Sequence, residues 1–116
     1  MIKLEQLSKR FQTDVIETTV INDINLEINT GEFVTIMGPS GCGKSTLMNI
    51  LGLIERPDVG RYLFNGIDVT SSTERQLTNL RRNNIGFIFQ NFNLIDELNV
   101  FENVELPLLY IKDMSR

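Results

Sequence analysis

The sequence predicts an α/β fold, with antiparallel strands first and then a strand that leads directly into a helix. Apolar and polar residues alternate strictly along residues 24–28 and nearly so along residues 2–7, which indicates strands with one buried face. Residues 33–37 form a nearly continuous apolar run, typical of a strand buried on both faces in a parallel sheet. Leucine and isoleucine then recur at helical spacing over residues 47–54, and Pro57 ends that helix.

A hairpin and a further strand are expected after this helix. Residues 61–64 and 67–69, joined at Asn65-Gly66, predict the hairpin. Residues 85–89 form a second run of the buried-strand type, and they place Gln90 at the carboxyl end of that strand.

Two capping boxes predict the remaining helices. Ser71 is followed by Glu74, and Asn99 by Glu102, which is the spacing at which two side chains cap one helix reciprocally. Pro107 limits the second of these helices.

Composition places the chain among globular proteins and excludes several classes of function. Of its 116 residues 41% are apolar and 22% charged, and the net charge of -4 argues against the broad basic face of a nucleic-acid-binding protein. Cys42 is the single cysteine and there is no histidine, so an internal disulfide and imidazole chemistry are both excluded. The chain has neither a signal-peptide pattern nor an apolar run of the about 18 residues that span a bilayer. We expect one cytosolic domain without direct membrane insertion.

The segment between the strand predicted at residues 33–37 and the first predicted helix carries a phosphate-binding motif. Residues 38–45 match G-x-x-x-x-G-K-[ST] at every fixed position, with a strand expected before and a helix after. Glycines allow successive backbone amides to point inward as an anion nest, and the helix adds the positive end of its dipole. The nucleotide-binding residues predicted from this loop are Gly38, Pro39, Ser40, Gly41, Cys42, Gly43, Lys44, Ser45 and Thr46.

Three of these side chains have distinct predicted roles. Lys44 binds the β- and γ-phosphates, Ser45 offers its hydroxyl to Mg²⁺, and Thr46 donates to the α-phosphate. The alternative is a glycine-rich turn without a ligand, which the glycines would weaken without structural gain. The Cys42 thiol is an alternative reactive group, although its backbone amide is the part that the loop uses.

The sequence after the loop resembles the ATP-binding domain of ABC transporters. The resemblance is carried by the run that ends at Gln90 and by Asn91-Phe-Asn-Leu-Ile95 and Val100-Phe-Glu-Asn-Val104. Residues 38–46, 81–95 and 102–109 look more specifically like the subfamily that serves lipoprotein release, macrolide export and antimicrobial-peptide export or resistance. The resemblance covers essentially the whole chain. It implies a P-loop ATPase fold, with an antiparallel subdomain and part of a parallel core sheet.

The resemblance also implies site residues. In the family a glutamine at the position of Gln90 reaches the metal and the attacking water, so Lys44 and Gln90 are the expected catalytic residues and Ser45 and Gln90 the expected metal ligands. An ordinary polar residue at the end of a strand is the alternative for Gln90. The family stacks adenine on an aromatic residue, usually tyrosine, at the position of Phe11, for which the alternative is a core residue.

The implied cofactors are ATP and Mg²⁺, and the implied partners are proteins. They are a transmembrane permease subunit and a second ATP-binding subunit that completes a nucleotide-sandwich dimer, with no nucleic acid. The family couples ATP binding and hydrolysis to export, here of a lipoprotein, peptide or drug-like substrate. Such a subunit is cytoplasmic and peripheral on the inner face of the plasma membrane, where it is attached through the permease.

The chain departs from the family pattern in what it lacks. Residues 1–116 contain no Leu-Ser-Gly-Gly-Gln signature, no Walker B Asp-Glu and no switch histidine, so we expect a partial domain that binds but does not turn over ATP. In the family's core sheet, residues 33–37 and 85–89 do not pair with each other, and here their apolar faces would be partly exposed. The alternatives are a truncated non-catalytic nucleotide-binding or interaction module, and an unrelated phosphate-loop kinase or GTPase. The Asn-Lys-x-Asp motif of a GTPase and the arginine-rich lid of a kinase are absent.

Overall fold

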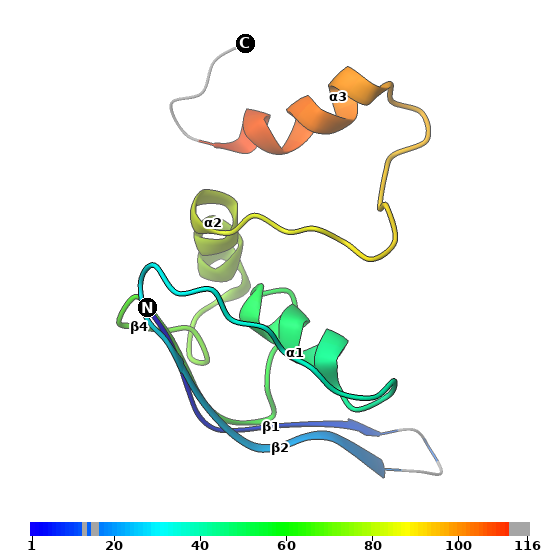
Figure 1. Ribbon diagram of the computed structural model, residues 1–116. Helices are drawn as coiled ribbons and strands as arrows, with labels where there is room; N and C mark the ends of the chain where they lie inside the picture. Colours follow the sequence, from blue (N-terminus) through cyan, green and yellow to red (C-terminus); the bar gives the residue numbers. More distant parts are fainter. Residues whose placement is uncertain (13, 15–16, 112–116) are drawn as a thin grey trace. The chain divides into compact units, whose positions relative to one another are not determined.

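The chain divides into two compact units, Met1–Thr73 and Glu74–Arg116. The computed structural model in Figure 1 describes residues 1–12, 14 and 17–111. The first unit contains a four-stranded sheet and one helix, and the second contains helical elements joined by irregular segments.

The sheet of the first unit has the strand order β2-β1-β3-β4. Its strands are β1 (Ile2–Gln12), β2 (Glu17–Ile28), β3 (Val59–Phe64) and β4 (Ile67–Asp68), and each described pair is antiparallel. The alternating patterns therefore predicted residues 2–7 of β1 and 24–28 of β2, while β1 extends on to Gln12 and β2 begins already at Glu17. Asn65 and Gly66 both have positive φ, 48° and 80°, as the tight turn of a two-residue hairpin requires, so the β3–β4 hairpin is also confirmed.

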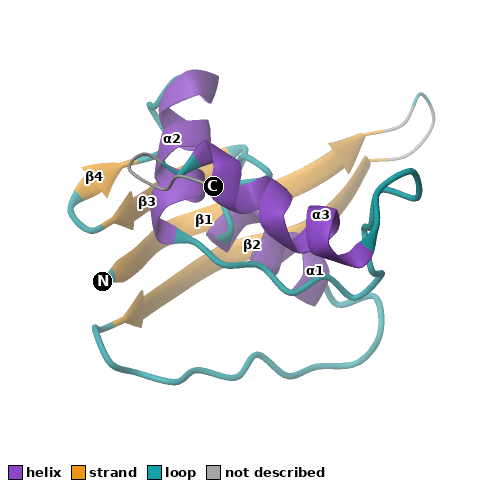
Figure 2. Ribbon diagram, turned by 90° about the horizontal axis from the view of Figure 1, so that it is seen from above, coloured by secondary structure: helices purple, strands orange, loops and turns teal. Residues whose placement is uncertain are grey.

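Helix α1 (Lys44–Leu51) covers one face of this sheet (Figures 1 and 2). Apolar side chains of the sheet, of α1 and of the residues just after α1 and β4 form the buried core of the unit: Leu4, Leu7, Ile21, Leu47, Ile50, Leu53, Tyr62, Phe64 and Val69. Leu4 of β1 lies opposite Leu26 of β2 on one side and opposite Tyr62 of β3 on the other, so the row of apolar side chains continues across these three strands.

The carboxyl end of α1 differs from the sequence prediction. The helix ends at Leu51, because Leu53 adopts a left-handed φ of 61° and reverses the chain. The amide of Leu53 donates to the Ile50 oxygen (3.1 Å) and the amide of Ile54 to the Asn49 oxygen (2.9 Å). These two bonds close a Schellman motif, so the chain leaves the helix well before Pro57.

Two predicted strands are not strands in the structure. Residues 33–37 and 85–89 belong to no ladder among the described residues, and Phe33 and Ile88 are 95% and 97% exposed. A strand needs a neighbour to satisfy its backbone amides and carbonyls, and no described strand pairs with either segment. The expectation that these segments expose apolar side chains is met. The parallel part of the expected sheet is absent from the described residues.

The second unit contains α2 (Glu74–Asn84), α3 (Val100–Glu105) and the 3₁₀ helix η1 (Leu106–Tyr110). The capping box at Asn99 is confirmed: its side chain accepts from the Glu102 amide (2.8 Å), and the Glu102 carboxylate accepts from the Asn99 amide (3.0 Å). The box at Ser71 was wrong, because α2 begins at Glu74 and the Ser71 hydroxyl donates to the Asp68 oxygen instead (3.3 Å).

The Asn103 side chain holds the segment before α3 in place. Its amide nitrogen donates to the backbone oxygens of Ile95, Leu98 and Asn99 at 3.2, 3.1 and 2.9 Å, and its oxygen accepts from the Ile95 amide at 2.9 Å. Pro107 lies in the first turn of η1, so the chain tightens there rather than leaving the helical path.

Replacing Tyr62 by phenylalanine should destabilise the first unit. The Tyr62 hydroxyl donates to the Leu51 oxygen at the end of α1 (2.7 Å), and burial raises the pKa of this phenol. Loss of the bond leaves that carbonyl without its donor, so we expect the free energy of unfolding to fall by about 0.5–1.5 kcal/mol in urea denaturation. Tyr110→Phe, at a residue 61% exposed, is the control and should change stability by less than about 0.5 kcal/mol. Equal effects of the two changes would contradict the assignment.

Candidate functional site

The loop of residues 38–45 runs into the first turn of α1. Gly43 precedes the helix with a left-handed φ of 96°, and Gly41 also has a positive φ of 80°. The Cys42 amide between them donates to the Pro39 oxygen (3.3 Å), and the Gly43 oxygen accepts from the Leu47 amide (3.0 Å). The alternation of left-handed glycines with an ordinary residue curves the backbone tightly before the helix, which is the kind of geometry that forms an anion nest.

Gly43 packs against strand β2. A Cβ added at Gly43 would lie 2.6 Å from the Val20 backbone oxygen and 3.0 Å from its Cγ1 atom. This contact requires glycine at position 43 for packing alone. The expectation that the glycines of the loop have no structural purpose was therefore wrong at this position. At Gly41 an added Cβ would meet nothing within 4 Å, so there the requirement is the positive φ alone.

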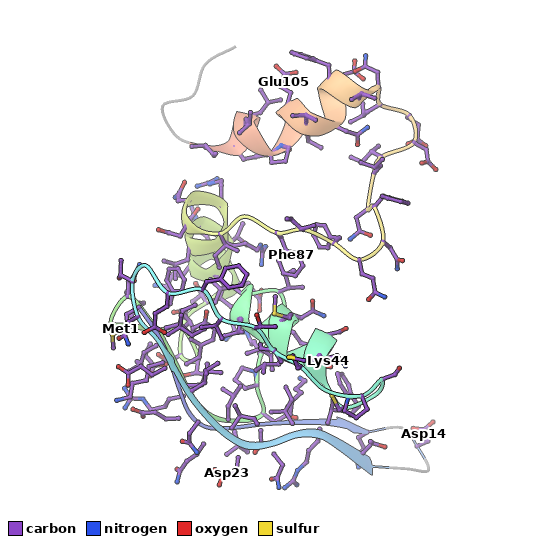
Figure 3. All side chains as sticks on the ribbon, in the orientation of Figure 1. Met1, Asp14, Asp23, Lys44, Phe87 and Glu105 are labelled. Carbon is purple, nitrogen blue, oxygen red and sulfur yellow. The ribbon has the colours of Figure 1, made fainter. Side chains whose placement is uncertain are left out.

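The Lys44 side chain folds back onto the loop. Its ammonium donates to the backbone oxygens of Gly38 and Pro39, the latter at 2.9 Å, and lies 3.8 Å from the Cys42 sulfur. Figure 3 shows Lys44 at the start of α1, on the face of the β1–β2 hairpin that this helix covers. The positive charge is therefore held at the curved loop, where it can make charge-assisted hydrogen bonds with an anion.

Ser45 and Thr46 occupy the first turn of α1. Ser45 is exposed and Thr46 partly buried, and no residue in the described part of the chain forms a hydrogen bond with either hydroxyl. Both hydroxyls can therefore bind a metal ion or a phosphate, which is the chemistry that a serine or threonine supplies at this place in a phosphate loop. Ser40, Gly41 and Cys42 are also exposed.

Phe11 lies near the end of β1, in the same unit as the loop. It pairs with Thr18 of β2 and is 41% exposed, so it is not a core residue. Gly43 touches Val20, and the neighbours of Val20, Thr19 and Ile21, pair with residues 10 and 9 of β1. The loop thus contacts the stretch of the hairpin in which Phe11 lies.

Gln90 belongs to the second unit. It is exposed and follows the irregular residues 85–89, in which the rings of Phe87 and Phe89 stack with centroids 4.6 Å apart. The structure thus brings Phe11 and residues 38–46 together within one unit, whereas Gln90 lies in the other.

Two kinds of feature are absent from the described residues. Among them there is no group of three or more histidine, cysteine, aspartate or glutamate side chains that could hold a metal ion. None of the described helices has the length and apolar character that a membrane span requires.

A family model described as "ABC transporter" matches residues 21–116. The chain belongs to the ABC transporter family. It is 49% identical over 110 residues to the macrolide export ATP-binding/permease protein MacB of Vibrio parahaemolyticus, covering 95% of this chain and 17% of that protein. It is 46% identical to the uncharacterized ABC transporter ATP-binding protein YknY of Bacillus subtilis, covering 95% of this chain and 48% of the relative.

The fold class is confirmed by solved structures. The ATP-binding cassette MJ0796, bound to ADP and Pi and described as dimeric, matches with a TM-score of 0.95 and 41% identity, covering all of this chain and 50% of the cassette. The antiparallel sheet with its phosphate-loop helix is thus that of an ABC ATPase, and the resemblance to macrolide exporters is confirmed. The chain spans about half the length of YknY and of MJ0796.

Replacing Gly43 by alanine should destabilise the first unit more than replacing Gly31. Both glycines have positive φ, 96° and 83°, so either alanine carries the left-handed strain of about 1–2 kcal/mol. Only the alanine at Gly43 also meets the Val20 oxygen, whereas nothing lies within 4 Å of the position at Gly31. We expect a clearly lower melting temperature for Gly43→Ala than for Gly31→Ala in thermal denaturation. Equal melting temperatures would contradict a tight contact between the loop and β2.

Proposed function

We propose that this chain is the N-terminal, nucleotide-binding portion of the ATP-binding subunit of an ABC exporter. The observation that carries the proposal is the loop of residues 38–46. Its curved backbone is positioned against β2, its lysine ammonium is held at the loop, and the hydroxyls of its first helical turn are without partners among the described residues. The family membership and the names of the relatives support ATP as the nucleotide.

Each site residue has a role that follows from its chemistry. The phosphates of ATP bind to the backbone amides of residues 41–46 and to the Lys44 ammonium, while Phe11 stacks with the adenine ring. Ser45 and Gln90 would hold a Mg²⁺ ion, which would supply positive charge to offset that of the phosphates. Ser45 has a hydroxyl and Gln90 an amide oxygen, both hard oxygen ligands of the kind that Mg²⁺ prefers. The exposure of Phe11, Ser45 and Gln90 agrees with these roles.

We propose that residues 1–116 alone bind ATP but do not hydrolyse it at the rate of an enzyme. Transfer of a phosphoryl group to water needs a group that orients the water and accepts its proton. Of the acidic residues in α3, Glu102 is the nearest in sequence to Gln90. Its carboxylate accepts a hydrogen bond from the Asn99 amide in the capping box. Its position on a capped helix gives no support to a role as catalytic base.

The partners proposed are a permease and a second ATP-binding subunit. The name of MacB joins an ATP-binding part to a permease, and the MJ0796 structure is described as dimeric. In the second unit α3 and η1 expose Phe101, Val104 and Tyr110 by 71%, 67% and 61%, which suits an apolar protein contact. We also propose that the subunit is cytoplasmic and is attached to the inner face of the plasma membrane through its permease. The cargo class proposed is a macrolide-like drug, a peptide or a lipoprotein.

Replacing Lys44 by alanine should weaken ATP binding. The change removes a charge-assisted contact worth about 1.5–3 kcal/mol, so the Kd for Mg-ATP should rise by about ten- to a hundredfold in isothermal titration calorimetry. Lys3→Ala is the control, because Lys3 lies in β1 and pairs with Glu5 (3.3 Å) away from the loop. The proposal is contradicted if Lys44→Ala and Lys3→Ala bind Mg-ATP equally well.

The chain of residues 1–116 should release phosphate from Mg-ATP far below typical enzymatic rates. The test is phosphate release with excess Mg-ATP, with Lys44→Ala as the blank. A rate of about 1 s⁻¹ or more that Lys44→Ala abolishes would show that the chain contains its own catalytic base.

A further inference from the structure

The Lys9 side chain lies between an acidic residue and the ring of Phe11. Its ammonium is 3.6 Å from the Asp58 Oδ1 atom and 5.6 Å from the centroid of the Phe11 ring. Only 15% of the Lys9 side chain is exposed, although it ends in a charged group, whereas Phe11 is 41% exposed. A lysine at the end of a strand is normally extended into water, so this placement needs specific contacts to hold it.

Asp58 is fixed to β1 on both sides of Lys9. Its backbone amide donates to the Ser8 oxygen (2.9 Å), and its Oδ2 atom accepts from the Arg10 amide (2.7 Å). The remaining carboxylate oxygen is the one that faces the Lys9 ammonium. Because the backbone of β1 fixes the carboxylate, the ammonium is held at one place beside the ring rather than free to sample many rotamers.

A cation held over a phenyl ring changes the ring as a stacking surface. The faces of the ring carry partial negative charge, and an ammonium within about 6 Å of the centroid is attracted to that charge. The attraction restrains the orientation of the ring. It also draws electron density away from the other face, which reduces the repulsion that this face presents to the π system of a stacked base. Phenylalanine has no hydroxyl through which its ring could be oriented by hydrogen bonds, and the Lys9 ammonium supplies an electrostatic contact that can orient it.

We propose that Lys9, held by Asp58, is a positioning residue that orients Phe11 for stacking with the base of the bound nucleotide. The inference rests on the proposed function, in which Phe11 stacks with adenine and residues 38–46 bind the phosphates. Lys9 acts through the ring and touches neither the base nor the phosphates. Its contribution is therefore specific to ligands that carry a base.

The experiment compares a ligand with a base and a ligand without one. In the full-length protein that the gene encodes, calorimetry gives the Kd for Mg-ATP and for Mg-tripolyphosphate in the wild type, Lys9→Met and Lys9→Arg. Lys9→Met keeps the length of the side chain and removes its charge, so it should weaken ATP binding by about two- to fivefold and leave tripolyphosphate binding unchanged. Lys9→Arg keeps the cation and should bind ATP as the wild type does.

A second pair of variants tests whether Lys9 acts through the ring. In a Phe11→Leu background, Lys9→Met should cause no further loss of ATP affinity. If Lys9→Met unfolds, Asp58→Asn replaces it with the same expectation, since the amide oxygen can still accept from Arg10 but no longer attracts the ammonium.

Three results would overturn the inference: unchanged ATP affinity in Lys9→Met, an equal loss for ATP and tripolyphosphate, or a loss that persists without the Phe11 ring. Its failure is distinguishable from that of the proposed function. If ATP binding depends on Lys44 but Lys9→Met has no effect on it, only the role of Lys9 is overturned. Wild-type protein that binds no ATP overturns both.

Discussion

The contact between Gly43 and Val20 is the constraint on which the candidate site depends. A backbone that passes within van der Waals distance of a strand leaves room for a hydrogen at that Cα and for nothing larger. This contact fixes the loop to the β1–β2 hairpin, and Lys44 and Ser45 follow it directly in α1. The same hairpin carries Phe11, so the contact between Gly43 and Val20 fixes the loop relative to the aromatic ring. A phosphate site and a base site must keep a fixed separation to bind one nucleotide, and here a single sheet provides it.

Local patterns predicted the elements whose stability is local. The alternation of polar and apolar residues gave β1 and β2, the Asn65-Gly66 pair gave the turn of the hairpin, and the fixed positions of the phosphate motif gave the loop and the start of α1. Asn99 and Glu102 cap each other within one turn of chain, so they too are visible in the sequence. In each case the partner of every hydrogen bond lies within a few residues or in the neighbouring strand.

Predictions failed where a distant or competing partner decides the outcome. Residues 33–37 and 85–89 have the composition of buried strands, but composition does not supply the neighbouring strand that a ladder requires. Ser71 does not cap α2: the helix begins at Glu74, three residues later, and the Ser71 hydroxyl donates to the Asp68 oxygen in the turn after β4. In the candidate site, the motif predicted the residues of the loop but not the contact with Val20 or the pairing of Lys9 with Asp58. These partners are far apart in the chain and meet only when the sheet forms.

The amide of Asn103 has a mechanical consequence. It joins the backbone of residues 95, 98 and 99 to α3 through four hydrogen bonds, so the stretch from Ile95 to Glu105 is stiff despite having few regular turns. The exposed apolar side chains of α3 are mounted on this stretch. A displacement of these side chains relative to residue 95 would have to break hydrogen bonds of the Asn103 amide. We therefore expect the residues from Ile95 to Glu105 to move together.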